Sequence, residues 1–148
     1  MDMLIRLYDL PAAKAVPDIV VRRAMAFEAS QICDWVSRTF RSQGWVDETR
    51  TALAHTPANC FVAMSDGALG GFCCYNTTCL GFVGPVGIAA DRRGQGIGQA
   101  VLLTALNAMR SAGYGYAVAG MVGAPEFFAR TAGATPIDGS DPGVYGRT

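Results

Sequence analysis

Three glycines alternate with other residues directly after an arginine, in the segment Arg93-Gly94-Gln95-Gly96-Ile97-Gly98. The segment lies between a strand-like run that ends at 86–88 and a long run with helical apolar periodicity. The first amides of a helix have no internal partners and point outward at the positive end of the helix dipole. Because glycines add no side chains there and Arg93 adds positive charge, the segment predicts a phosphate or pyrophosphate site.

Two common phosphate-binding patterns do not match this segment. A Walker-type loop requires a lysine after its last glycine, and no lysine follows Gly98. The dinucleotide pattern has a different glycine spacing and expects an acidic residue about 20 positions later within a βαβ unit, whereas 107–121 contains none. Coenzyme A is the third ligand that such a turn can hold.

The elements around the turn indicate an α+β fold with a mixed sheet, and not the regular alternation of a doubly wound fold. Apolar patterning and turn residues predict the following elements: strands at 3–8, 19–23, 60–64, 69–75, 80–88, 116–122 and around 144–145, and helices at 28–40, 47–54, 96–112 and from 125 to near 133.

Composition narrows the class of protein further. A chain of 148 residues with 51% hydrophobic and 16% charged residues is one folded domain and not a disordered chain. Its formal net charge of zero disfavours nucleic acid as a partner. We expect a soluble, cytoplasmic protein without a membrane partner, because the sequence has neither a secretory signal nor an apolar run of the roughly 20 residues that span a bilayer.

The five cysteines do not form a metal-binding pattern. No Cys-x-x-Cys pair occurs and the chain has one histidine, so we expect no metal site. Cys73 and Cys74 are neighbours in a predicted strand, where their side chains point to opposite faces. We interpret them as small buried apolar residues.

The order of elements and the glycine turn resemble the GCN5-related N-acetyltransferase (GNAT) superfamily over about 19–133. The family signature, Arg/Gln-x-x-Gly-x-Gly/Ala, matches here as Arg93 to Gly98. The resemblance implies a mostly antiparallel mixed sheet flanked by helices, in which a splayed strand pair holds the cofactor. It also implies a single acyltransferase domain over 1–148, with an N-terminal extension at 1–17 and a C-terminal tail at 136–148.

The resemblance further implies acetyl-CoA as acyl donor. Backbone amides of the turn would hold the pyrophosphate, the strand before the turn would hydrogen-bond the pantetheine arm, and Arg92 or Arg93 would reach the 3′-phosphate. The expected cofactor-binding residues are Val86, Gly87, Ile88, Arg93, Gly94, Gln95, Gly96, Ile97, Gly98 and Gln99.

The residues of the transfer step depart from the family pattern. Many members use a tyrosine of the fourth helix as the acid, and Phe128 stands at that position. Three tyrosines could substitute, namely Tyr145 in the tail and Tyr114 and Tyr116 at the start of the last predicted sheet strand before the fourth helix, and a thiolate can also leave without an acid. The strand at 82–88 carries no carboxylate, so Glu126 or relayed water is the candidate base.

The acceptor pocket of such enzymes is built from the first two helices and the loop between them, together with later loops. Arg41 could hold an acceptor carboxylate, and Trp45 is a second candidate for contact with the acceptor, within a wider set that also contains Ser42, Gln43 and Glu48.

The function expected from this resemblance is acetyl transfer to a primary amine of a small molecule or peptide, by direct attack in a ternary complex. The alternative is a coenzyme-A-binding sensor or partner module with little activity. A nicotinamide or flavin oxidoreductase is disfavoured by the motif. A homodimer is common in such folds and is expected by analogy only.

Overall fold

The computed structural model describes residues 1–146, in which seven strands form one sheet in the order β2-β3-β4-β5-β6-β1-β7. Only β5 and β6 pair in parallel, and the other neighbours are antiparallel. The strands are β1 (Met3–Arg6), β2 (Ile19–Arg23), β3 (Cys60–Ser65), β4 (Ala68–Tyr75), β5 (Phe82–Ile88), β6 (Tyr116–Ala119) and β7 (Thr135–Pro136). The α+β fold and the mostly antiparallel mixed sheet expected from the sequence are confirmed.

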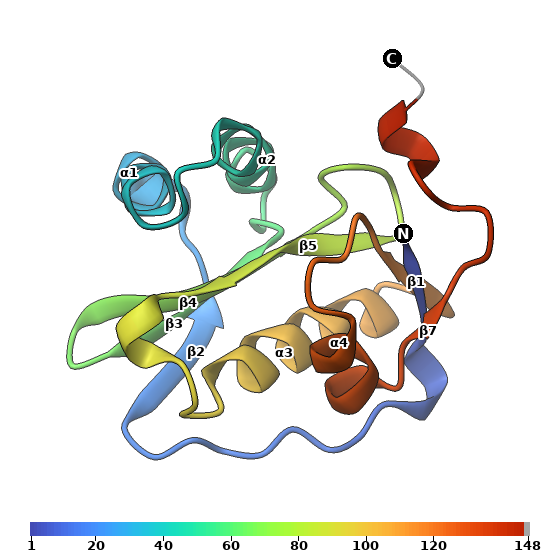
Figure 1. The fold of residues 1–148 in the computed structure, drawn as a ribbon. Coiled ribbons are helices and arrows are strands. Elements are labelled where there is room, and N and C mark those ends of the chain that lie inside the picture. Colours follow the sequence, from blue (N-terminus) through green and yellow to red (C-terminus); the bar gives the residue numbers. More distant parts are fainter. Residues whose placement is uncertain (147–148) are drawn as a thin grey trace.

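Helices cover both faces of the sheet, as Figure 1 shows, with α1 and α2 on one face and α3 and α4 on the other. They are α1 (Ala29–Phe40), α2 (Gln43–Leu53), α3 (Ile97–Ser111) and α4 (Pro125–Ala132). Each face therefore has its own core. Leu102 and Leu106 of α3 belong to one, and Trp35 and Phe72 belong to the other. Among the described residues, no helix is long and apolar enough to cross a membrane.

The two-sided burial of the central strands explains the paired cysteines. Cys73 packs in the core beneath α3, whereas Cys74 packs in the core beneath α1 and α2. Both side chains are fully buried, and burial raises the pKa of each thiol well above its usual value. The interpretation of these residues as small buried side chains agrees with this packing.

The α1–α2 connection is tighter than the sequence predicts. The chain leaves the helical conformation only at Arg41, which is left-handed with φ +54°, and at Ser42, which is extended. The Ser42 hydroxyl then accepts a hydrogen bond from the Trp45 amide at 3.3 Å and caps α2. The helix thus begins at Gln43 and includes Gly44, four residues before the predicted start.

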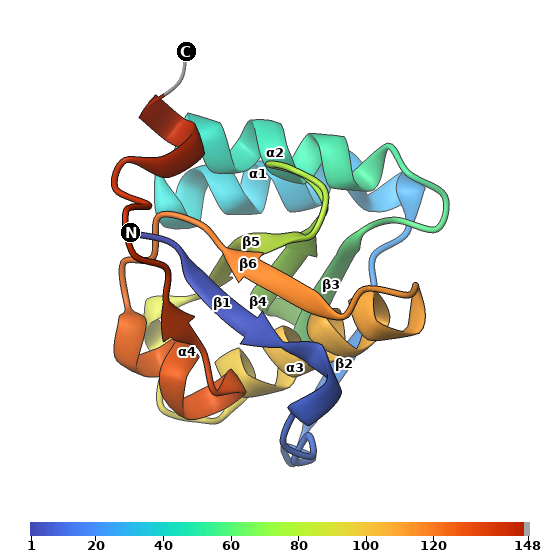
Figure 2. The ribbon, with the colours of Figure 1, turned by 90° about the vertical axis from the view of Figure 1, so that its right-hand side faces the viewer.

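The N-terminal segment is part of the sheet. β1 lies between β6 and β7, with Met3 opposite both Ala119 and Pro136 (Figure 2). The Ile5 side chain is fully buried against α3 and α4. The residues that the sequence suggests as an extension therefore contribute an internal strand.

The tail differs from its predicted form. Residues Gly143–Gly146 form a short 3-10 turn, so the strand predicted around 144–145 is wrong. The last strand is instead β7, two residues long, paired with the start of β1. The glycine and proline content of the tail suits a turn better than a ladder of hydrogen bonds.

Candidate active site

The parallel pair β5–β6 separates soon after it starts. Its ladder contains only Phe82 opposite Val118 and Val83 opposite Ala119. β6 then ends, while β5 continues to Ile88 and stays paired with β4 on its other side. The sheet therefore opens between the carboxyl-terminal half of β5 and the loop after β6.

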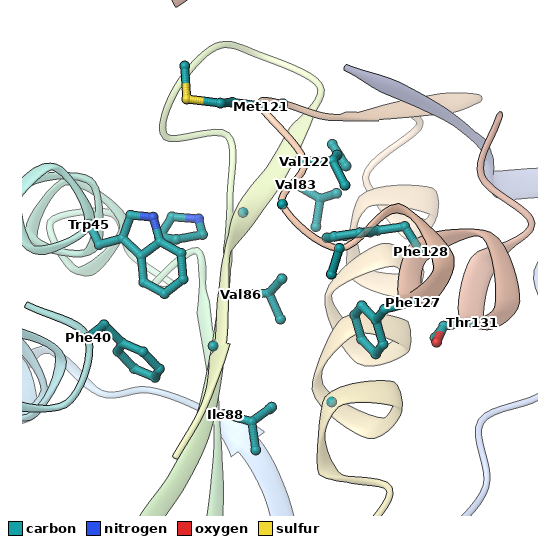
Figure 3. A pocket seen from close by; sticks show the side chains of 18 of the residues that line it. Phe40, Trp45, Val83, Val86, Ile88, Met121, Val122, Phe127, Phe128 and Thr131 are labelled. Carbon is teal, nitrogen blue, oxygen red and sulfur yellow. The ribbon is translucent and has the colours of Figure 1, made fainter. Parts of the chain in front are cut away.

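A bulge in β5 turns three apolar side chains toward this opening. Val83 lies opposite Tyr75 and Val86 lies opposite Cys73, so three steps along β5 match two steps along β4. The extra residue lies at Gly84-Pro85 and shifts the alternation of the strand. Val83, Val86 and Ile88 consequently point to the same side, toward α3 and α4 (Figure 3).

A cavity of about 920 Å³ passes through the opening, a volume near the upper end of the range for small-molecule sites. Phe40, Trp45 and Glu48 line it from the α1–α2 side of the sheet. Phe127 and Phe128 line it from the α4 side, and Figure 3 shows these two groups of rings on opposite sides of β5. The cavity can hold two molecules that approach each other from opposite faces of the sheet.

The glycine turn forms one end of the cavity. Gly94 and Gly96 have φ values of +79° and +83°, a region that residues with a Cβ rarely adopt. Gly96 is the N-cap of α3, and no side chain in the described part of the chain caps it. The first hydrogen bond of the helix runs from the Ala100 amide to the Gly96 carbonyl, so the amides of 97–99 remain available to an anion.

The two arginines of the turn have different surroundings. Arg92 donates a 2.6 Å hydrogen bond to the Ser65 hydroxyl and lies 4.0 Å from Asp66 and 3.9 Å from Asp91. Arg93 is exposed, lines the cavity and has no acidic partner within the described residues. Arg93 is therefore the arginine free to meet a phosphate.

Gly87 makes room for aromatic rings as well as for a ligand. A Cβ at this position would lie 2.6 Å from the ring of Phe40 and 2.9 Å from that of Trp45. These two rings pack 5.1 Å apart and both contact the Phe72 ring of β4. The absence of a side chain at Gly87 lets α1 and α2 approach β5 closely.

Tyr145 reaches the cavity from the tail. A Cβ at Gly120, the residue after β6, would collide with the Tyr145 hydroxyl, so this hydroxyl lies where β5 and β6 part. Burial raises the pKa of Tyr145, an interaction with Thr78 opposes the rise, and the charge of Glu48 adds to it. The phenol is therefore protonated at neutral pH and can donate a proton.

Asp2 holds the tail beside the cavity. Its amide donates to the Ser140 hydroxyl at 2.8 Å, and its buried carboxylate accepts a 2.9 Å hydrogen bond from the Met121 amide. The Ser140 hydroxyl donates in turn to the Ile137 carbonyl at 2.6 Å. One residue of the N-terminus thus fixes both the loop after β6 and the segment that leads to Tyr145.

The structure brings most of the expected cofactor residues together, and their roles remain predictions. Those that line the cavity are Val86, Gly87, Ile88, Arg93, Gly94, Gly96, Ile97, Gly98 and Gln99, whereas Gln95 is exposed and outside the lining.

The candidates for the transfer step and for acceptor binding separate into two groups. Tyr145 and Trp45 line the cavity, whereas Glu126 and Arg41 are exposed and outside its lining. Glu48 is the carboxylate that does line it. Trp45 and Glu48 are three residues apart and lie on one helix face. The sequence does not predict this shared face, because the helix that it predicts starts at residue 47 and excludes Trp45.

Comparison with known proteins identifies the family. The profile of the Acetyltransferase (GNAT) family matches residues 29–133, about seven-tenths of the chain. The chain belongs to this family of acyltransferases. No curated protein matches the sequence.

Solved structures of low sequence identity share the fold. A GCN5-related N-acetyltransferase from Sphaerobacter thermophilus aligns with a TM-score of 0.72 and 22% identity over 90% of this chain and 47% of that one. The GCN5-related glucosamine N-acetyltransferase region of a fungal multi-domain GH3 beta-N-acetylglucosaminidase aligns with 0.69 and 16%, over 88% and 19%. A GNAT family acetyltransferase from Brucella melitensis, solved with acetyl-CoA, aligns with 0.52 and 24%, over 64% and 70%. The chain spans less than half the length of the first two.

Proposed function

We propose that the chain is an acetyl-CoA-dependent N-acetyltransferase that acts on a primary amine of a small molecule or peptide. The observation that carries the proposal is the cavity that crosses the sheet at the β5–β6 opening, with the glycine turn at one end and α2 at the other. An acyl donor bound on the α3–α4 side and an amine on the α1–α2 side can then meet at the opening. This arrangement supports direct attack in a ternary complex.

The donor side suits coenzyme A in shape and charge. The free amides of 97–99 and the exposed Arg93 would hold the pyrophosphate at the start of α3. The apolar side chains of Val86, Ile88 and Phe127 would border the uncharged pantetheine arm. The thioester supplies the acetyl group, and the protein supplies its position.

The transfer step requires a neutral amine and a thiolate that can leave. Phe128 borders the cavity but has no proton to give. The protonated phenol of Tyr145 lies where the strands part, and we assign it the role of proton donor to the departing sulfur. Glu126 is not a member of the proposed site, because it lies outside the cavity lining.

Two measurements test the proposal. Calorimetry should detect stoichiometric binding of coenzyme A, and thiol release from acetyl-CoA should accelerate when primary amines are added. Initial rates at varied concentrations of both substrates should give intersecting reciprocal plots, as a ternary complex requires. Binding without amine-dependent thiol release would instead favour the coenzyme-A-binding module, and failure to bind coenzyme A would overturn both.

The proposal also includes the cellular location and the oligomeric state of the protein. A cytoplasmic location is supported by the five free cysteines, which suit a reducing compartment. A homodimer stays a prediction by analogy, and sedimentation in the presence and absence of coenzyme A would test it.

A further inference from the structure

We propose that Glu48, oriented by Thr78, binds the ammonium group of the acceptor, and that this acceptor carries its amine on an apolar body. The inference rests on the proposed function, because it names the residue and the acceptor class of that same site. It concerns the α1–α2 end of the cavity.

Glu48 is held in the cavity wall by one hydrogen bond. It lies on α2, one turn after the capped N-terminus, and its side chain is partly buried. The Thr78 hydroxyl, from the loop between β4 and β5, donates to its Oε1 atom at 2.8 Å. This hydrogen bond occupies one lone pair of Oε1. The second carboxylate oxygen and the remaining lone pairs of Oε1 can accept hydrogen bonds from other partners.

The carboxylate lacks a cationic partner within residues 1–146, although four ion pairs form elsewhere in that range. It is also the one carboxylate among the residues that line the cavity. Partial burial of an uncompensated charge is unfavourable, and a bound cation removes that cost. An ammonium group is the cation that an amine acceptor brings.

Apolar residues line the same cavity as Glu48. Trp45 lies one helical turn earlier on the same face, and Phe40 packs against it. Met121 lines the cavity from the loop after β6 although the residue is 58% exposed. An aromatic or aliphatic body attached to the amine would cover these side chains and remove their apolar surface from water.

With Glu48 and Tyr145 in the cavity wall, each proton transfer of the reaction has a donor and an acceptor. Glu48 takes one proton from the ammonium group and later releases it to solvent. The neutral nitrogen then forms a C–N bond with the thioester carbonyl carbon, and the C–S bond breaks. Tyr145 gives its proton to the departing sulfur and regains one from the nitrogen, so the products are an amide and a free thiol.

Calorimetry on the protein saturated with coenzyme A tests the inference with two matched probes, 2-phenylethylamine and 2-phenylethanol. The wild-type protein should bind the amine more tightly than the uncharged alcohol. Glu48→Gln should weaken amine binding by about tenfold or more, the effect of losing a charged hydrogen bond. The same variant should leave the affinities for the alcohol and for coenzyme A within about twofold.

Asp47→Asn is the matched control, because it removes the same charge from the neighbouring position of α2. Asp47 contacts Gln43 and Arg50 on the exposed surface and lies outside the cavity lining. It should bind both probes as the wild type does. Glu48→Asp keeps the charge and should retain part of the preference for the amine.

Three results would overturn the inference. They are equal affinity of the wild type for the two probes, equal loss of amine binding in Glu48→Gln and Asp47→Asn, and no binding of the amine to the coenzyme A complex. Coenzyme A binding is measured separately in every variant. The proposed function fails if the wild-type protein does not bind coenzyme A or if amines do not accelerate thiol release from acetyl-CoA, and both results are distinguished from a failure at Glu48.

Discussion

Gly94 and Gly96 combine two requirements at one place. Their positive φ values bend the chain into α3, and their missing side chains leave the amides of that helix open to the cavity. A glycine with positive φ can also serve a purely structural turn elsewhere in the chain. Gly113 follows α3 with φ +106° and lies outside the cavity lining. Gly94 and Gly96 differ from Gly113 because they lie at the N-terminus of α3, where the positive end of the helix dipole favours an anion.

We expect Gly94→Glu to weaken coenzyme A binding by about tenfold or more, because it adds a side chain and a negative charge beside the pyrophosphate site. Gly113→Glu is the matched control. Both glycines have positive φ, and a Cβ at either would meet no other atom within 4 Å. Calorimetric titration with coenzyme A should separate them, and equal affinity of two folded variants would contradict the placement.

At the scale of elements, the site depends on one short pairing that stops early. Two residue pairs join β5 to β6, and the bulge at Gly84-Pro85 then directs the side chains of β5 into the opening. The loop that leaves β6 needs support of its own because no ladder continues there. Asp2 supplies it, through the Met121 amide and Ser140.

Replacing Asp2 tests this support. Asp2→Ala should lower stability by about 1–3 kcal/mol, because it removes the hydrogen bond that the buried carboxylate accepts from the Met121 amide, whereas the contact of the Asp2 backbone amide with Ser140 remains. It should also speed hydrogen exchange at the Met121 amide, while the amides of β3 keep their protection. Asp2→Asn retains an acceptor oxygen and should remain near the wild type. Unchanged exchange at Met121 in Asp2→Ala would show that Asp2 does not hold the loop.

At the scale of the whole molecule, a sheet covered on both faces has two consequences. It buries most residues of β3 and β4, and it lets one opening connect two helical layers. The burial of the cysteines illustrates the first consequence. Cys33, Cys60, Cys73 and Cys74 are buried, whereas Cys79 lies partly exposed in the loop between β4 and β5.

Alkylation of the native protein should therefore modify Cys79 first. The thiolate is the reactive form, and burial both shields Cys73 and Cys74 and raises the pKa of their thiols. Mass spectrometry after brief iodoacetamide treatment should find the label at Cys79 alone, and all five sites should react in denaturant. Labelling of Cys73 in the folded protein at the rate of Cys79 would contradict the two-layer core.

Local sequence signals predicted the glycine turn, most of the element order and the family, and coenzyme A as the ligand stays a prediction. They are local because a cap, a hairpin turn or a helical stripe is encoded within a few neighbouring residues. The sequence alone places the start of α2 too late, because Gly44 disfavours a helix interior, although Ser42 supplies the helix cap.

Tertiary structure decided which side chains share the cavity. Asp2 and Ser140 are 138 positions apart, and Glu48 and Thr78 are 30 apart, so neither contact follows from periodicity. Their partners depend on β1 entering the sheet beside β6 and on the packing of α2 over the β5 opening. The glycine turn could be found from the chain alone because its own backbone makes it. The meeting of Trp45, Glu48, Thr78 and Tyr145 could not, because three separate segments must pack together first: α2, the loop between β4 and β5, and the tail.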